Sequence, residues 1–181
     1  MPRRSGVNPL SAKWATLGIL ASLALAFVFP AASPLQADRT CCPPSGGGAT
    51  LAPGIQGMAS AFDPAQYRGK VLIVNFMAEW CPGCWSELPG LVRLSWKYKD
   101  RGLAVVGISV GSLREGTLKL IQQFGIAYPV YLDPEGRVAV ERFRLTGMPS
   151  TFIYDKNGKL VRSLRGGVSE PVLKTIVAAL L

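Results

Sequence analysis

The 181-residue sequence contains no histidine. This absence excludes Cys/His zinc sites, histidine-ligated haem or copper, and catalytic arrangements of the Ser-His-Asp or Cys-His kind. Cysteine is also scarce, with four residues, and a chain of this length can bury a core without a framework of disulfides. The cysteines therefore indicate chemistry rather than cross-linking, and we expect no metal and no cofactor.

Acidic residues are few, 11 against 20 basic ones, so the formal net charge is +9. Three basic residues, Arg3, Arg4 and Lys13, precede a long apolar run. From Asp38 onward, 17 basic residues face 11 acidic ones, which leaves +6. These charges are scattered singly, without a basic cluster or interleaved aromatic residues, so they indicate a solvated cationic surface and not nucleic-acid binding.

Residues 14–32 form an apolar run of 19 residues without a charge. The length is closer to that of a membrane-spanning helix than to that of a secretory signal, and Ala-Ala-Ser-Pro at 31–34 is a poor cleavage site. We interpret residues 1–37 as a signal or anchor segment, and favour an uncleaved anchor over a cleaved signal. In either case the basic flank stays inside, which predicts a domain on the periplasmic side of the cytoplasmic membrane.

Residues 38–57 are rich in Pro, Gly, Ser and Ala, which predicts a flexible tether. Cys41 and Cys42 lie in this segment. A ring between adjacent cysteines requires a strained backbone, and two thiols without histidine make a poor metal site. Incidental or intermolecularly paired thiols are therefore expected here, and a redox relay is the alternative.

The globular domain is expected over residues 58–181, with strands that alternate with helices and end in a hairpin. Val71–Met77 is a nearly continuous apolar run, typical of a central strand. The helix expected at 81–99 has apolar residues three and four positions apart at Trp85, Leu88, Val92 and Trp96. Further strands are expected at 103–110, 128–132, 151–155 and 160–165, and helices at 114–124, 136–143 and 172–181. This pattern predicts an α/β sandwich with a mixed sheet.

A Cys-Pro-Gly-Cys turn follows the strand Val71–Met77 and opens the next helix. Unpaired N–H groups and the dipole at a helix N-terminus favour a thiolate at Cys81. Cys84 lies one turn further in, where we expect a buried thiol, and Glu87 lies three residues beyond it. The spacing predicts dithiol–disulfide exchange, in which Cys81 attacks a disulfide and Cys84 resolves the mixed disulfide with Glu87 as base.

The motifs WCPGC at 80–84 and GMPSTF at 147–152 together resemble the thioredoxin superfamily, and more narrowly its TlpA/ResA-like branch, which is related to the AhpC/TSA redoxins. Beside the two cysteines, the residues that carry the resemblance are Trp80, Pro82, Gly83, Met148 and Pro149. The resemblance implies a thioredoxin fold, with a central mixed sheet flanked by helices and a cis peptide bond before Pro149. It also implies that the loop of Met148 and Pro149 lies against the Cys81 sulfur, where it can pair with an extended substrate backbone.

The sequence departs from this family at two positions. Thioredoxins carry a buried Asp six residues before the first cysteine, where this chain has Asn75, which does not titrate. The branch carries its acid at the position of Glu87, although a first-turn acid favoured only by the helix dipole is the alternative. In this branch an Asp often follows the strand that here reads Val-Gly-Ile-Ser at 106–109, and this chain has Val110-Gly111 in its place.

Trp80 and Trp85 are interpreted as core and rim packing, and Glu79 as a surface charge.

Members of this branch are membrane-tethered extracytoplasmic oxidoreductases that include the reductants of cytochrome c maturation. Pro82 and Gly83 place no histidine between the cysteines, which favours a reducing couple. Together these features predict a reductase of protein disulfides, with apocytochrome c as first substrate, copper-site cysteines of oxidase assembly as second, and a membrane thiol-disulfide carrier as electron donor. A thiol peroxidase is a rival, but Ala78 replaces the threonine that it requires.

Overall fold

The computed structural model describes residues 54–181. The predicted signal or anchor segment at 1–37, most of the predicted tether, and Cys41 and Cys42 lie outside the described residues. Within residues 54–181, no helix combines the length and apolar character that a membrane span requires.

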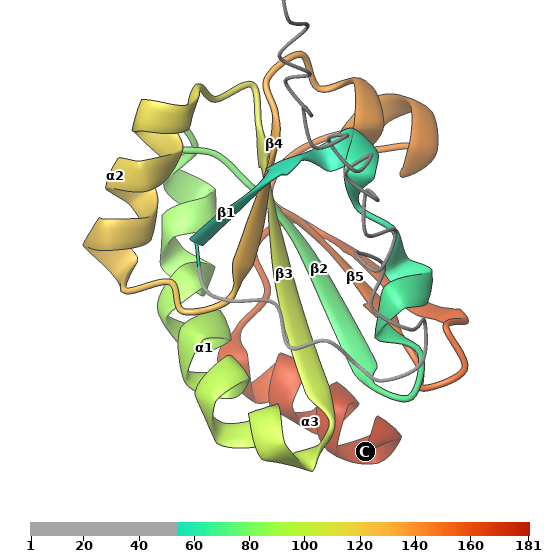
Figure 1. Cartoon of the computed structure of the whole chain (residues 1–181). Coiled ribbons are helices and arrows are strands. Elements are labelled where there is room, and N and C mark those ends of the chain that lie inside the picture. Colours follow the sequence, from blue (N-terminus) through green and yellow to red (C-terminus); the bar gives the residue numbers. More distant parts are fainter. Residues whose placement is uncertain (1–53) are drawn as a thin grey trace, which may run out of the picture. The chain divides into compact units, whose positions relative to one another are not determined.

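A six-stranded mixed sheet in the order β1-β4-β3-β2-β5-β6 forms the centre of the domain (Figure 1). The strands are β1 (Gly54–Met58), β2 (Val71–Met77), β3 (Leu103–Val110), β4 (Pro129–Asp133), β5 (Ser150–Tyr154) and β6 (Leu160–Arg165). The first four strands are parallel to one another, whereas β5 is antiparallel to β2 and β6 to β5. The predicted α/β sandwich with a mixed sheet and a hairpin before the last helix is confirmed.

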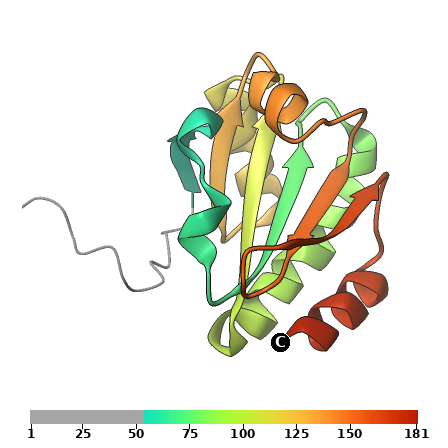
Figure 2. The same cartoon turned by 90° about the vertical axis from the view of Figure 1, so that its right-hand side faces the viewer.

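Helices cover both faces of the sheet (Figures 1 and 2). The helices of one face are α1 (Pro82–Tyr98), α2 (Arg114–Phe124) and α3 (Glu170–Leu180), with η3 (Lys99–Arg101) directly after α1. The short helices of the other face are η1 (Ala59–Ala61), η2 (Pro64–Tyr67) and η4 (Val138–Arg142). Because both faces are covered, β2 is buried at every position, as its continuous apolar sequence predicts.

The side chains of β2 alternate between two hydrophobic clusters. Ile73 and Met77 lie in the cluster beneath α1 and α3, which also contains Cys84. Val74 and Phe76 lie in the opposite cluster, beneath the short helices. Both faces of β2 are therefore packed, and the Cys-Pro-Gly-Cys turn follows the C-terminal end of this buried strand.

The buried face of α1 differs from the predicted one. Its buried residues are Cys84, Glu87, Leu88, Gly90, Leu91, Leu94 and Tyr98. Of the four apolar residues that gave the helical spacing, Leu88 is buried and Val92 is half-buried against the core, while Trp85 is 36% and Trp96 57% exposed. The spacing of the two tryptophans indicated the wrong face of the helix as the buried one. The buried face is the one that carries Leu91 and Leu94, which pack into the core.

The sheet already includes Gly54, so the predicted tether, which extends to residue 57, overlaps the folded domain. Residues 54–58 form β1, which pairs in parallel with β4 at the edge of the sheet. Two of its five residues are glycines with positive φ, Gly54 at 108° and Gly57 at 140°. Glycine has low β-propensity, so this strand depends on backbone pairing with β4 and lacks a local sequence signal. The other predicted elements agree with the observed bounds to within two residues.

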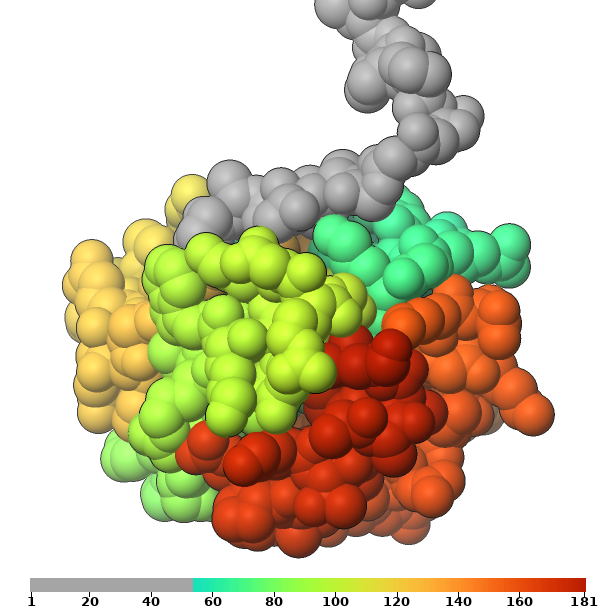
Figure 3. Space-filling view, turned by 90° about the horizontal axis from the view of Figure 1, so that it is seen from below, coloured from blue at the N-terminus to red at the C-terminus, as the bar shows by residue number. Residues whose placement is uncertain are grey.

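The C-terminal helix α3 packs against α1. Seen from below, the atoms of the C-terminal segment lie directly against those of the end of α1 (Figure 3). Gly90 allows this close approach, because a Cβ atom at that position would lie 3.0 Å from the Cβ atom of Glu170. Arg93 pairs with Glu170 at 2.6 Å, on the exposed side of the junction. The segment that precedes α3 is thereby held near the first half of α1.

Candidate active site

Cys81 and Cys84 lie where β2 passes into α1, and a disulfide joins them with their Cα atoms 5.3 Å apart. Cys81 is the N-cap of α1, and its Sγ atom accepts a hydrogen bond from the backbone N–H of Cys84 at 3.2 Å. Pro82 takes the first helical position, where its missing N–H group costs no helical bond. The sulfur of Cys81 thus lies at the positive end of the helix, which stabilises a thiolate once the disulfide is reduced.

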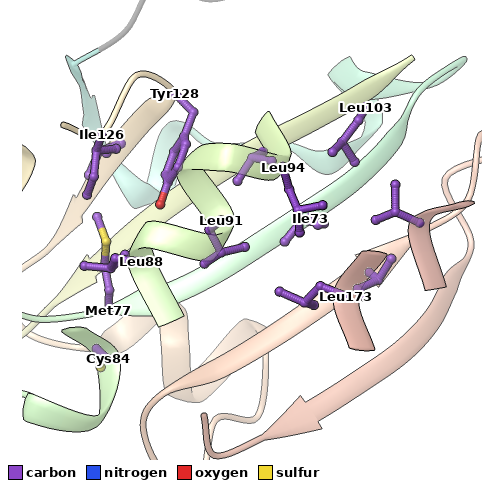
Figure 4. Packing of buried hydrophobic residues seen from close by; sticks show 14 of the residues in the cluster. Ile73, Met77, Cys84, Leu88, Leu91, Leu94, Leu103, Ile126, Tyr128 and Leu173 are labelled. Atoms are coloured by element: carbon purple, nitrogen blue, oxygen red, sulfur yellow. The ribbon is translucent and has the colours of Figure 1, made fainter. Parts of the chain in front are cut away.

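The two cysteines differ in their access to solvent. Cys81 is 7% exposed and Cys84 is completely buried. Most of Cys81 is thus covered, although the residue opens the helix. Figure 4 shows Cys84 within the hydrophobic cluster that also contains Met77 and Leu88. Cys81 is therefore the more accessible of the two cysteines.

The loop of Met148 and Pro149 lies against the turn between the cysteines. The Met148–Pro149 peptide bond is cis, in agreement with the resemblance. A Cβ atom on Gly83 would lie 3.3 Å from Cδ of Pro149, so Gly83 permits a close approach that a side chain would crowd. The Ser150 hydroxyl donates to the carbonyl oxygen of Gly147 at 2.8 Å and closes the loop.

Glu87 is buried, with 4% of its surface exposed. Its Oε1 atom accepts a hydrogen bond from Nδ2 of Asn75 at 2.6 Å, and its Oε2 atom accepts one from the backbone N–H of Val168 at 3.1 Å. Burial raises the pKa of Glu87 above its ordinary value of 4.5, and the hydrogen bonds from Val168 and Asn75 oppose that rise. The first turn of α1 contains no acidic residue, so the alternative of a first-turn acid is wrong.

Asn75 links the buried acid to the strand after Pro149. Its Nδ2 atom donates both to Glu87 and to the Thr151 hydroxyl oxygen, the latter at 3.1 Å. Asn75 and Thr151 are also paired across β2 and β5. The sequence identified Asn75 only as a residue that does not titrate. Its link to Thr151 and the contact of Glu87 with Val168 were missed, because their partners are 76 and 81 residues apart in the chain.

The AhpC/TSA family matches residues 52–163, more than half of the chain. The chain belongs to the AhpC/TSA family. The chain is 30% identical over 108 residues to thiol-disulfide oxidoreductase ResA of Geobacillus thermodenitrificans. The aligned region covers 60% of this chain and 62% of the relative. ResA of Halalkalibacterium halodurans is 22% identical over 162 residues, across 89% of this chain and 90% of the relative.

Among solved structures, the AhpC/TSA chain resembles a thiol:disulfide interchange protein of the thioredoxin family from Chlorobium tepidum TLS. The TM-score is 0.60 and the identity 31%, over 66% of this chain and 85% of that one. The predicted thioredoxin fold is therefore confirmed. The matched region spans 60–62% of the length of the first two curated relatives.

In this AhpC/TSA domain, Trp80 covers one side of the turn that carries the cysteines. The residue is 57% exposed, and its Nε1–H group donates to the carbonyl oxygen of Gly111 at 3.2 Å. A Cβ atom on Gly111, which has a φ of +62°, would lie 3.4 Å from the ring. Trp80 therefore packs at the rim of the site and not in the core. Its partner loop is the one where this chain departs from the family at Val110-Gly111.

Glu79 is not the surface charge that the sequence predicted. Its side chain is packed against the first turn of α2, since a Cβ atom on Gly116 would lie 2.7 Å from the Glu79 Cδ atom. One of its carboxylate oxygens is buried. The Glu79 side chain therefore lies between the turn before Cys81 and α2.

Proposed function

We propose that this chain is a thiol-disulfide oxidoreductase that reduces protein disulfides through Cys81 and Cys84. The observation that carries the proposal is the arrangement of the cysteines at the start of α1, with the sulfur of Cys81 at the helix N-terminus and Cys84 fully buried. The names of the curated relatives support the same reaction class.

In the first step, the thiolate of Cys81 attacks one sulfur of a substrate disulfide. The substrate disulfide breaks, a mixed disulfide forms between Cys81 and the substrate, and the other substrate sulfur leaves as a thiolate that takes a proton from solvent. The access difference between the cysteines selects Cys81 for this step, because an attacking sulfur has to reach its target.

In the second step, Cys84 gives its proton to the Glu87 carboxylate, and its thiolate attacks the Cys81 sulfur. The mixed disulfide breaks, the reduced substrate leaves, and the chain ends with the Cys81–Cys84 disulfide. Cys84 and Glu87 are three residues apart on α1 and both face the interior, so the proton stays out of bulk water. A raised pKa suits this role, since a base works best when its pKa lies near the operating pH.

The loop of Met148 and Pro149 supplies the docking edge for the substrate. Pro149 lies next to Gly83, and the half-buried Met148 packs against both hydrophobic clusters. An extended substrate segment beside Pro149 would bring its disulfide to the exposed part of Cys81. The exposed ring of Trp80 borders the same turn and limits the approach from the other side.

The segment at 1–37 supports a location on the periplasmic side of the cytoplasmic membrane, either tethered or secreted. The absence of histidine between the cysteines supports a reducing couple. Apocytochrome c cysteines are the first candidate substrate and copper-site cysteines of oxidase assembly the second, and a membrane thiol-disulfide carrier would re-reduce Cys81 and Cys84.

The test is the reduction of insulin disulfides by the full chain that has first been reduced with dithiothreitol and freed of it. We expect about one insulin disulfide opened per chain, and none with the Cys81→Ser variant. Consumption of hydrogen peroxide without insulin reduction would instead support the peroxidase. Equilibration in glutathione or dithiothreitol buffers tests the direction, and a potential near about −120 mV, the range of strong oxidants, would contradict a reductase.

A further inference from the structure

Three polar side chains from different parts of the fold are buried on the same side of the sheet as Cys84. They are Asn75 of β2, Glu87 of α1 and Tyr128, which directly precedes β4. None of them is more than 4% exposed. The reaction sequence described above uses Glu87 and its partner Asn75, but it assigns no role to Tyr128.

Gly107 opens the path by which Tyr128 reaches this group. In the sheet, β3 separates β4 from β2, and its residue Gly107 pairs with Val130 on one side and Asn75 on the other. A Cβ atom on Gly107 would lie 3.4 Å from Cε2 of Tyr128, the ring carbon next to the one that bears the hydroxyl. The ring therefore lies over β3 where that strand has no side chain. Figure 4 shows its hydroxyl oxygen directed inward, on the side where Met77 and Leu88 lie.

Hydrogen bonds in this group are unevenly distributed. The Asn75 amide nitrogen donates twice, to Glu87 and to Thr151, whereas the Asn75 carbonyl oxygen accepts no bond among the described residues. The Tyr128 hydroxyl is also without a partner among residues 54–181. A buried hydroxyl without a partner is costly, and each carboxylate oxygen of Glu87 can accept more than the one bond it has. One donor and several acceptor positions are thus left over in the same interior region.

Tyr128 and Glu87 also interact electrostatically. Burial raises the pKa of the Tyr128 hydroxyl, and the negative charge of Glu87 raises it further. The hydroxyl therefore keeps its proton at every pH at which the protein works, and it remains a donor.

The proposal rests on the function proposed above. We propose that Tyr128 is a positioning residue for Glu87: its hydroxyl donates to the Asn75–Glu87 pair when Glu87 is ionised, and it thereby favours the carboxylate that takes the proton of Cys84. A hydrogen bond to the charged form of an acid stabilises that form. Tyr128 would thus keep a deeply buried acid ready to act as a base.

Other charged groups around Glu87 are few. On α1 and α3, Arg93 and Glu170 pair with each other at the surface of the junction. β2 contributes Asn75, β5 contributes Thr151 and the segment before α3 contributes the backbone of Val168, none of which titrates. The remaining titratable groups of this cluster are the two cysteines and Tyr98 at the far end of α1. The effect of Tyr128 on Glu87 can therefore be isolated by a single substitution.

The test compares Tyr128→Phe with wild type in the full chain. Tyr67→Phe is the matched control, because it removes one buried tyrosine hydroxyl from the opposite face of the sheet. The rate of resolution of a preformed mixed disulfide is followed against pH. In Tyr128→Phe we expect the midpoint of the acidic limb of this pH–rate profile to move up by about one pH unit. Resolution is then about tenfold slower at pH values below the wild-type midpoint and unchanged well above it. In Tyr67→Phe the midpoint stays at the wild-type value.

The second readout is the pKa of Glu87 itself, followed by the NMR shift of its ¹³C-labelled carboxyl group in the reduced full chain. We expect this pKa to rise in Tyr128→Phe only. An unchanged Glu87 pKa, or a loss of rate that is equal at all pH values, would overturn the role of Tyr128. Failure of the proposed function would be seen separately, as wild-type chain that opens no insulin disulfide, and the NMR titration decides the role of Tyr128 even then.

Discussion

Replacement of Glu87 by glutamine tests whether the buried carboxyl group moves the proton of Cys84. Glutamine has nearly the same size, but its amide does not take up a proton in the neutral range. General bases contribute about 10²- to 10⁴-fold to a rate, so we expect resolution to slow by about 100-fold or more. The first attack should keep its rate, because the Cys81 sulfur is stabilised by the backbone N–H of Cys84 and not by Glu87.

The same substitution changes the stability of the fold, which has to be measured separately. Glu87 accepts hydrogen bonds from two donors through two oxygens, and glutamine offers a single oxygen, so either Asn75 or Val168 is left with an unpaired donor. That loss costs about 1–3 kcal/mol of unfolding free energy.

The pH dependence of the unfolding free energy reports the ionisation of Glu87 in the folded chain. Because burial raises the pKa of Glu87 in the folded chain, the folded state binds more protons than the unfolded state between the ordinary value of 4.5 and the raised one. The wild-type unfolding free energy therefore falls as the pH rises through that window, and Glu87→Gln lacks this fall. Chemical denaturation of the oxidised chain at several pH values measures both curves.

The kinetic assay mixes reduced chain with a disulfide substrate, quenches with an alkylating reagent and quantifies the mixed disulfide. We expect it to accumulate in Glu87→Gln and not in Glu115→Gln, a matched change of an exposed acid on α2. Unchanged turnover of Glu87→Gln, or an equal slowing of both steps, would refute the assignment of Glu87 as the base.

Two further predictions concern the surroundings of this site. Asn75→Ala removes a hydrogen bond that lowers the pKa of Glu87, so the acidic limb of resolution should move to higher pH and the chain should lose about 1–3 kcal/mol; an unmoved limb in a pH–rate profile would contradict the link. Leu91→Ala empties a fully buried position under α1 and should cost about 2–5 kcal/mol in urea unfolding, while the folded fraction still reduces insulin; a loss under 1 kcal/mol would refute the packing.

Local signals in the sequence predicted much of the domain. The apolar run of β2 is buried on both faces, so its sequence reports its place without ambiguity. Asn157-Gly158 between β5 and β6 is a local signal for the hairpin, because such turns require the positive φ that Gly158 adopts at 79°. The order of Cys81 and Cys84 at a helix start likewise follows from residues that are adjacent in the chain.

Features that depend on distant partners were not predictable in this way. β1 owes its place to pairing with β4, 75 residues along the chain from Gly54 to Pro129. The rotation of α1 depends on how Leu91 and Leu94 pack into the core, and the aromatic residues of the same helix were a misleading guide. Burial of Glu87 depends on Val168, whose position is set by the docking of α3, so its altered pKa has no local signal.

The most direct test of the central claim is a trapping experiment with the full chain and a disulfide-containing protein. Cys84→Ser cannot resolve the mixed disulfide, so it should accumulate a covalent complex on a non-reducing gel that dithiothreitol releases, and mass spectrometry should locate the bond at Cys81. Cys81→Ser should form no such complex, because Cys84 is fully buried. Equal trapping through Cys84, or no complex with either variant, would contradict the division of roles between the two cysteines.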